Sequence, residues 1–98
     1  MTTQSDSDQY YDITSASGSH LILFGELGEQ WTDEVLGLLE TEELDVFFFP
    51  WSSVVDLRLQ LDLIYYPVVQ IWNAGSLKAE LVGYHHESLT TIIDKEIR

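Results

Sequence analysis

The chain has 98 residues, 45% of them hydrophobic, which suits one domain with a single core and excludes a wholly disordered chain. It carries 17 acidic and four basic residues, giving a formal charge of −13, so no basic surface is available for nucleic-acid phosphates or anionic membranes. It contains no cysteine, which excludes disulfides, thiolate metal ligands and thiol redox chemistry.

The excess of acidic residues has three interpretations: a surface that keeps the protein in solution, adaptation to a salt-rich habitat, and mimicry of a polyanion such as DNA. A basic protein is the natural partner of such a surface, and we expect no direct binding to nucleic acid or membrane. No apolar run is long enough to span a bilayer, and the polar segment from Met1 to Gln9 lacks the features of a secretory signal. We therefore expect a soluble, cytoplasmic protein.

The first predicted elements are a polar tail and two strands. We expect residues Met1 to Asp8 to be mobile, because their polar side chains cannot repay the entropy of ordering, and we expect one domain over residues 9–98. Residues Gln9 to Thr14 are predicted as a short edge strand. The apolar run from Leu21 to Phe24, within His20 to Leu27, predicts a strand covered on both faces.

A helix and a further strand follow. Apolar residues recur at helical spacing from Trp31 to Leu44, and either Thr32 or Gln30 stands near the predicted N-cap. Three consecutive phenylalanines within Asp45 to Trp51 predict a buried central strand that Pro50 ends. Strand, helix and strand in this order predict a right-handed parallel crossover.

The segment from Ser52 to Ile64 has two interpretations. Apolar and polar residues alternate, which indicates a strand, whereas its leucine, arginine and glutamine residues and its N-terminal serines favour a helix. A helix would have two apolar stripes on opposite faces. One stripe contains Val55, Leu59 and Leu63 and can cover a sheet. The other is predicted to be an exposed contact patch for assembly and contains Val54, Leu57 and Leu61, with Arg58 beside them.

The segment from Tyr65 to Tyr84 predicts a β-hairpin. Pro67 has no N–H for a sheet ladder and therefore fits at the start of a strand that begins with Val68. The run Asn73-Ala74-Gly75-Ser76 has the chemistry of a tight turn. A final helix that starts near His85 has one apolar face, made by Leu89, Ile92, Ile93 and Ile97.

This order of elements resembles the thioredoxin-like fold over roughly residues 21–97, as do the local motifs Leu63-Ile64-Tyr65-Tyr66-Pro67, Asn73-Ala74-Gly75 and Leu81-Val82-Gly83. The resemblance implies an α/β domain whose central mixed β-sheet of about four strands is flanked by helices and ends in a hairpin and a helix. It also implies a cis peptide bond before Pro67, and it favours the helical interpretation of Ser52 to Ile64.

The sequence departs from the redox members of this family at their reactive motif. They have Trp-Cys-Gly-Pro-Cys between the first central strand and its helix, where this chain has Gly28-Glu29-Gln30-Trp31-Thr32. Glu29 and Thr32 take the two cysteine positions, and neither can form a thiolate, so the oxidoreductase activity is not carried over. Residues Ser15 to Ser19 are too few to hold the family's N-terminal helix, which we expect to be missing.

The resemblance also points to a binding site beside the hairpin. It places six residues at the edge where family members bind extended peptides: Glu29, Trp31, Thr32, Tyr65, Tyr66 and Pro67. The alternative is that the tryptophan and the tyrosines fill the vacated groove as core residues.

We therefore expect a non-enzymatic module that binds or scaffolds a protein partner through this groove, without cofactor or metal. The alternatives are an acidic, DNA-like mimic that binds a basic protein, and a structural homodimer closed through the predicted contact patch. His85, His86 and Glu87, with His20, lack a convergent fourth ligand, so a solvated helix entrance is favoured over a metal site.

Overall fold

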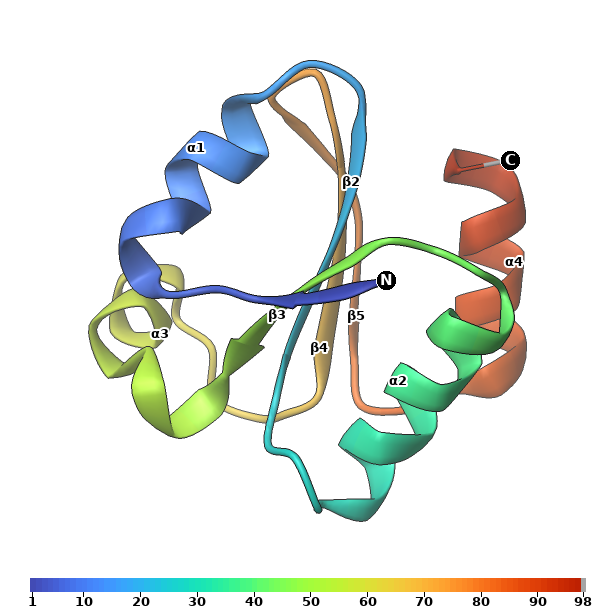
Figure 1. The fold of residues 1–98 in the computed structure, drawn as a ribbon, viewed down its shortest axis with the longest axis horizontal. Helices are drawn as coiled ribbons and strands as arrows, with labels where there is room; N and C mark the ends of the chain where they lie inside the picture. Colours follow the sequence, from blue (N-terminus) through green and yellow to red (C-terminus); the bar gives the residue numbers. More distant parts are fainter. Residues whose placement is uncertain (98) are drawn as a thin grey trace.

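A computed structural model describes residues 1–97 and shows a five-stranded mixed sheet with helices on both faces (Figure 1). The strand order is β1-β3-β2-β4-β5, where β1 and β2 run parallel to β3, and β4 runs antiparallel to β2 and β5. The strands are β1 (Thr2–Gln4), β2 (Ser19–Gly25), β3 (Val46–Pro50), β4 (Val68–Asn73) and β5 (Ser76–Val82). The α-helices are α1 (Tyr10–Ser15), α2 (Gln30–Thr41), α3 (Val55–Leu61) and α4 (His86–Glu96), and the short 3₁₀ helices are η1 (Ser7–Gln9) and η2 (Trp51–Ser53).

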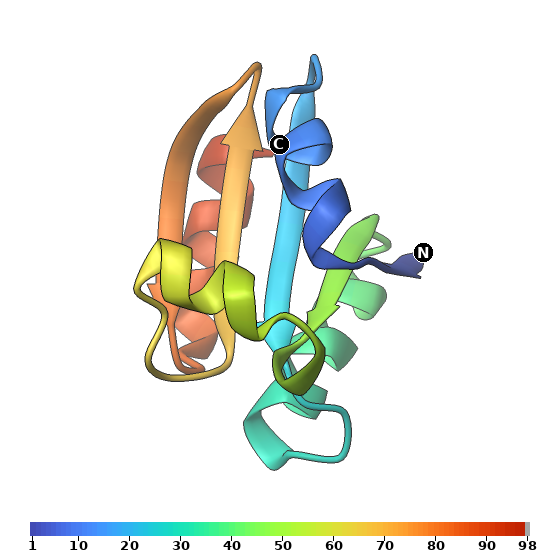
Figure 2. The same ribbon diagram turned by 90° about the vertical axis from the view of Figure 1, so that its left-hand side faces the viewer.

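The helices form two layers. α2 and α4 lie on one face of the sheet, and α1 and α3 lie on the other (Figures 1 and 2). Because side chains alternate across a strand, β2 supplies Leu21 and Leu23 to the core under α2 and α4, and Ile22 and Phe24 to the core under α1 and α3. The prediction that this apolar run is covered on both faces is confirmed.

The crossover from β2 through α2 to β3 agrees with the prediction, with β2 and β3 parallel. The cap of α2 differs from it. The N-cap is Glu29, whose side chain accepts a hydrogen bond from the backbone of Thr32, whereas we expected Thr32 or Gln30 near the cap. Glutamate is a rarer cap than serine or aspartate, so the sequence signal was weak.

The N-terminal segment, which we expected to be mobile, contains a strand. Thr2–Gln4 form β1, which pairs in parallel with β3 and adds a fifth strand to the four expected. The N-terminal amino group also contacts the Leu44 carbonyl oxygen and the Asp45 carboxylate. The hydrogen-bonding groups of the β3 edge order this polar segment, because a backbone ladder does not require apolar side chains.

The segment from Gln9 to Thr14 is not the edge strand that we predicted. Tyr10–Ser15 form α1, so the N-terminal helix that we expected to be missing is present as a short helix. Tyr10 and Thr14, four residues apart, are both buried on one helix face. The Gln9 side chain accepts a hydrogen bond from the Asp6 backbone N–H at 2.9 Å, which helps to hold the turn before the helix.

The ambiguous segment contains η2 and the helix α3, which confirms the helical interpretation. Its exposed face is the opposite of the one predicted. Val54 and Leu57 are buried in the core, whereas Leu59 is 72% exposed and Val55 is 46% exposed. The two stripes have similar composition, and the position of the helix on the sheet decides which one is covered.

The hairpin and the final helix agree with the prediction. β4 begins directly after Pro67, the Tyr66–Pro67 peptide bond is cis, and α4 buries Leu89 and Ile93. The hairpin turn is made by Ala74 and Gly75, both with positive φ angles, as in the tight turns that match the twist of a hairpin.

Candidate functional site

The N-terminus of α2 is held by the residues at the two cysteine positions. The Glu29 carboxylate accepts a hydrogen bond from the Thr32 N–H at 2.8 Å, and the Thr32 hydroxyl accepts one from the Glu26 N–H at 3.2 Å. Thr32 is completely buried and packs against Gly25, where a Cβ atom would lie 2.6 Å from its side chain. Glu29 and Thr32 therefore stabilise the start of the helix, and a partner cannot reach Thr32.

Glu26 links the loop between β2 and α2 to η2, the segment that follows β3. Its carboxylate accepts a hydrogen bond from the backbone N–H of Ser52 in η2. The carboxylate thus joins the end of β2 to the segment that follows β3, and within residues 1–97 no hydrogen bond connects it to a nucleophilic side chain. The contact assigns Glu26 a role in positioning the two loops.

Trp31 lies beside the helix start and belongs to an aromatic group with the end of the hairpin. It is 48% exposed and stacks on Tyr84 with ring centroids 6.1 Å apart. The Tyr84 hydroxyl in turn lies 3.1 Å from Nδ1 of His86, at the first turn of α4. The ring of Trp31 is therefore half covered by Tyr84 and half open to solvent.

The loop before Pro67 presents three large, mainly apolar side chains to solvent. Ile64 is 74% exposed, Tyr65 70% and Tyr66 38%. Within the described residues, the backbone N–H and C=O groups of these three residues make no hydrogen bond. Both apolar side chains and unpaired backbone groups are thus available to a binding partner.

Contacts with the core and with η2 hold this loop in place. Pro67 is buried, and its carbonyl oxygen accepts a hydrogen bond from the Gly83 N–H at 2.7 Å. The ring of Tyr66 packs on Trp51 with centroids 5.0 Å apart. Figure 1 shows the loop at the same end of the sheet as the N-termini of α2 and α4. The loop is therefore fixed at its C-terminal side, while Tyr65 extends away from the core.

Arg58 contributes to this support instead of to a free contact patch. Its guanidinium carbon lies 4.4 Å from the centre of the Trp51 ring, a cation–π geometry. Together with the burial of Val54 and Leu57, this contact corrects our prediction of an exposed interface, because only Leu61 of the predicted apolar trio is partly exposed.

A small cavity of about 190 Å³ adjoins the loop. Its lining includes Ile64 and Tyr65 of the loop, Leu61 of α3 and Val82 of β5, together with the acidic residues Asp62 and Glu80. Val82 is 47% exposed. We call the surface formed by Ile64, Tyr65, Tyr66 and Val82 the Pro67 surface. Its side chains are mainly apolar, it adjoins this hollow, and the backbone groups of its loop have no hydrogen-bond partner within residues 1–97.

The structure divides the six predicted site residues into two groups. Tyr65, Tyr66 and Pro67 form one continuous loop, and Trp31 reaches the same end of the sheet through Tyr84, which directly follows the Gly83 that bonds Pro67. Glu29 and Thr32 are occupied in the helix cap. Ile64 and Val82 were not predicted, although the run of apolar residues from Leu63 to Tyr66 is a signal that marks the loop.

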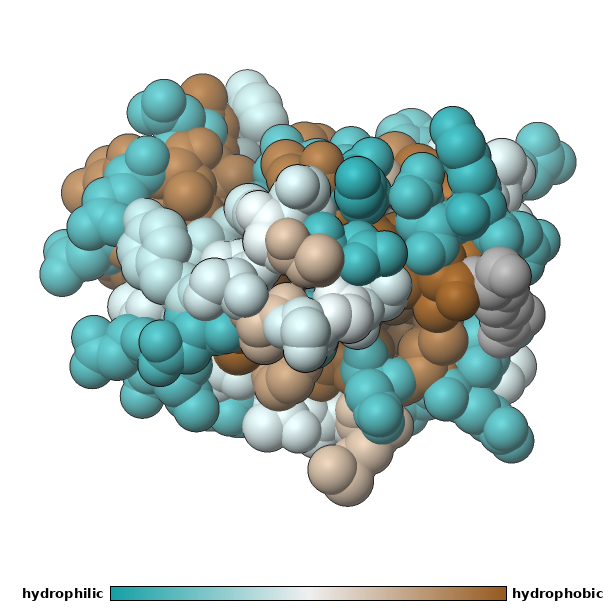
Figure 3. Space-filling view, turned by 90° about the horizontal axis from the view of Figure 1, so that it is seen from above, coloured by the Kyte–Doolittle hydropathy of each residue, from teal (hydrophilic) through white to brown (hydrophobic). Residues whose placement is uncertain are grey.

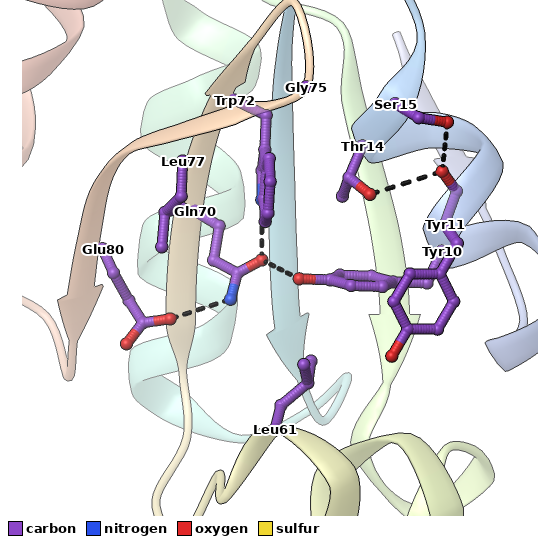
Figure 4. A pocket seen from close by; sticks show the side chains of 10 residues that line it. All are labelled: Tyr10, Tyr11, Thr14, Ser15, Leu61, Gln70, Trp72, Gly75, Leu77 and Glu80. Atoms are coloured by element: carbon purple, nitrogen blue, oxygen red, sulfur yellow. Dashed lines mark hydrogen bonds between the residues drawn. The ribbon is translucent and has the colours of Figure 1, made fainter.

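Sequence reasoning also missed a buried polar network on the α1 and α3 face of the sheet (Figure 4). The Gln70 side-chain oxygen accepts hydrogen bonds from the Tyr10 hydroxyl at 2.7 Å and the Trp72 indole at 3.0 Å, and the Gln70 amide donates to the Glu80 carboxylate at 2.8 Å. Burial raises the pKa of Tyr10 to about 12. The sequence signal was Gln70 itself, a single polar residue in the apolar run of β4.

The histidines take part in separate local contacts. The His20 ring lies 2.9 Å from the Ser17 carbonyl oxygen, and His86 lies beside the Tyr84 hydroxyl. Over residues 1–97, no group of three or more histidine, aspartate or glutamate side chains is arranged to hold a metal ion. None of the helices in this range is both long enough and apolar enough to cross a membrane.

No protein-family model matches the chain, and no curated protein matches its sequence. Solved structures of thioredoxins do match. Spinach chloroplast thioredoxin f has a TM-score of 0.82 at 12% identity, with 99% of this chain and 94% of that chain covered. Thioredoxin from Malassezia sympodialis has a TM-score of 0.80 at 13% identity, covering 97% and 90%, and that from Plasmodium falciparum has 0.74 at 15%, covering 96% of each.

At these identities the similarity establishes the fold. The chain has the thioredoxin-like fold, and without cysteine it lacks the Cys-X-X-Cys motif. It therefore has no thiol with which to exchange a disulfide.

Proposed function

We propose that the protein is a non-redox binding module that holds an extended, apolar segment of a protein partner on the Pro67 surface. The observation that carries this proposal is the exposure of Ile64 and Tyr65, 74% and 70%, on a loop whose backbone groups are unpaired within residues 1–97. An extended peptide can pair with such backbone groups and place alternate side chains in the neighbouring hollow. Aromatic side chains supply much of the binding energy in interfaces of this kind.

The chemistry at the start of α2 supports a binding role without catalysis. The residues at the two cysteine positions are engaged in capping and packing, and Thr32 is buried. The adjacent Trp31 ring is open on one side and extends the apolar surface across Tyr84. A peptide that lies across the loop before Pro67 would therefore meet aromatic side chains at both ends of its path.

A second candidate function is binding of a basic protein by the acidic surface, as in polyanion mimicry. It is favoured by the formal charge of −13. Seen from above, the molecule shows extensive hydrophilic surface with smaller hydrophobic areas between (Figure 3). The two candidates differ in salt dependence, because binding through exposed charges weakens as ionic strength rises, and binding through apolar side chains does not.

The test is affinity capture of partners from the source cell with the wild-type protein and two single variants, washed in parallel at low and high salt. Tyr65→Ser removes an apolar side chain from the Pro67 surface. Leu59→Ser is the matched control, because Leu59 is 72% exposed and Tyr65 is 70% exposed, but Leu59 is on the outer face of α3.

We expect a defined partner that survives the high-salt wash, is lost with Tyr65→Ser and is kept with Leu59→Ser. Loss with both variants would contradict a site confined to the Pro67 surface, because the outer face of α3 would then also contribute to binding. A set of basic proteins released by salt and unaffected by Tyr65→Ser would replace the first candidate with the second.

A further inference from the structure

The face of the sheet that α1 and α3 cover has an opening over β4 and β5. The two helices have six and seven residues, so each extends only about 9 to 11 Å. The strands beneath them have six and seven residues and extend about 20 to 24 Å. The helices lie towards different ends of the strands (Figure 1). A cavity of about 560 Å³ lies over the strands next to the two helices, within the size range of small-molecule sites.

The walls of this cavity are mainly aromatic and aliphatic. Tyr10 and Tyr11 come from α1, Leu61 from α3, Trp72 from β4 and Leu77 from β5 (Figure 4). Leu77 is 45% exposed, so the cavity opens to solvent on the β5 side. An apolar group of ligand size would cover the exposed parts of Tyr11, Trp72 and Leu77 and gain the corresponding hydrophobic free energy.

The polar groups of the cavity converge on one carboxylate. Gln70 is 3% exposed, and the hydrogen bonds from Tyr10 and Trp72 to its oxygen leave its amide nitrogen directed at Glu80. The bond from Gln70 engages Oε2 of Glu80 at 2.8 Å and positions the carboxylate at the cavity. Tyr10 and Gln70 are buried and Glu80 is exposed, so the buried part of the network holds a carboxylate that solvent can reach. This support positions the carboxylate before a ligand arrives, which lowers the cost of binding.

The Glu80 carboxylate is positioned without a cationic partner in the described part of the chain. Lys78 is two residues away on the same strand and makes no ion pair with it. The formal charge of −13 attracts cations to the whole surface, and the aromatic side chains of Tyr11 and Trp72 line the cavity beside the carboxylate. The carboxylate, the net charge and the aromatic side chains therefore all favour a cationic ligand.

We propose that this cavity binds a small organic cation, an aromatic or branched aliphatic group that carries a protonated amine. The ammonium group donates hydrogen bonds to Glu80, and the hydrocarbon body packs against Leu61, Trp72 and Leu77. The cavity shares Leu61 and Glu80 with the lining of the small hollow beside the Pro67 surface. The proposal itself does not depend on the function proposed for that surface.

The test is a titration of the ¹⁵N-labelled protein with tryptamine, followed by NMR, with the neutral alcohol tryptophol as the matched ligand. The Trp72 indole N–H and the Gln70 side-chain amide lie at the site and report binding directly. The Trp72 signal is assigned with Trp72→Phe. We expect both reporter groups to shift with tryptamine, and tryptophol to bind about tenfold more weakly because it lacks the charged donor.

Glu80→Gln should reduce tryptamine binding to the level of tryptophol and leave tryptophol binding unchanged, which also shows that the cavity survives the substitution. Glu34→Gln, an exposed position on α2 on the opposite face of the sheet, removes the same charge and should leave tryptamine binding as in the wild type. The proposal is overturned if neither reporter shifts, if the two ligands bind equally, or if Glu80→Gln and Glu34→Gln weaken tryptamine equally.

Discussion

Replacing Gly25 by alanine tests the packing at the junction of β2 and α2. A Cβ atom at this position would lie 2.6 Å from both Cγ2 and Oγ1 of Thr32 and 3.1 Å from its Cβ. Thr32 cannot rotate away freely, because it is completely buried and its hydroxyl is bonded to the Glu26 N–H. Overpacking of this kind costs about 1 to 3 kcal/mol of the free energy of unfolding.

Gly37→Ala is the matched control for this experiment. Gly37 is in α2, and a Cβ atom there would have no neighbour within 4 Å. The substitution should therefore raise the free energy of unfolding by about 0.5 to 1 kcal/mol through helix propensity and reduced freedom of the unfolded chain. Urea unfolding followed by tryptophan fluorescence measures both variants, and the same chemical change is expected to have opposite signs at the two positions.

A double-mutant cycle assigns the Gly25→Ala effect to Thr32. Thr32→Ala alone removes the hydroxyl and the methyl group that the new Cβ would meet, at the cost of the bond to Glu26. In combination, the two substitutions should destabilise the protein by about 1 kcal/mol less than the sum of the single effects. Equal stabilisation by Gly25→Ala and Gly37→Ala, or strict additivity with Thr32→Ala, would refute the close contact on which this reasoning depends.

Two further predictions concern the α1 and α3 side of the sheet. Burial raises the pKa of Tyr10 from 10.0 to about 12, so between these values the unfolded chain releases the proton first and the free energy of unfolding falls, by up to about 2 to 3 kcal/mol. Urea unfolding below and above pH 10 should show this fall in the wild type and a smaller one in Tyr10→Phe, and equal falls would contradict the prediction. Leu57→Ala should lower the free energy of unfolding by about 2 to 5 kcal/mol, because Leu57 is buried, whereas Leu59→Ala, 72% exposed, should change it by less than about 0.5 kcal/mol. Urea unfolding measures both effects. If Leu59→Ala were the more destabilising variant, Leu59 and not Leu57 would face the sheet, as the sequence predicted.

The elements that the sequence predicted well are those with a strong local signal. The apolar run from Leu21 to Phe24 and the three phenylalanines of β3 are typical of strands with two covered faces. Pro67 and the turn at Gly75 indicate the hairpin. The N-terminal elements could not be predicted in this way. β1 is ordered by backbone bonds to β3, and the short α1 has few apolar residues beyond Tyr10.

The candidate site shows the same limit at the level of single side chains. The sequence located the aromatic residues beside Pro67 but did not separate Tyr65, which is 70% exposed, from Thr32, which is completely buried. For α3, the sequence analysis found both apolar stripes but predicted the wrong one to be exposed. Helical spacing specifies which residues share a face, whereas the tertiary contacts decide which face packs on the sheet.

The end of the sheet that holds the reactive dithiol in redox thioredoxins combines a closed part and an open part in this protein. The closed part is the start of α2, where Glu29 and Thr32 are engaged in hydrogen bonds and packing. The open part is the loop before Pro67, where Ile64 and Tyr65 remain in solvent although burial of either would stabilise the fold. Exposed neighbouring apolar side chains on a well-supported loop are costly for a protein that acts alone, and coverage by a partner removes this cost. This contrast within one end of the fold is the reason why our proposal assigns partner binding to the loop and not to the start of α2.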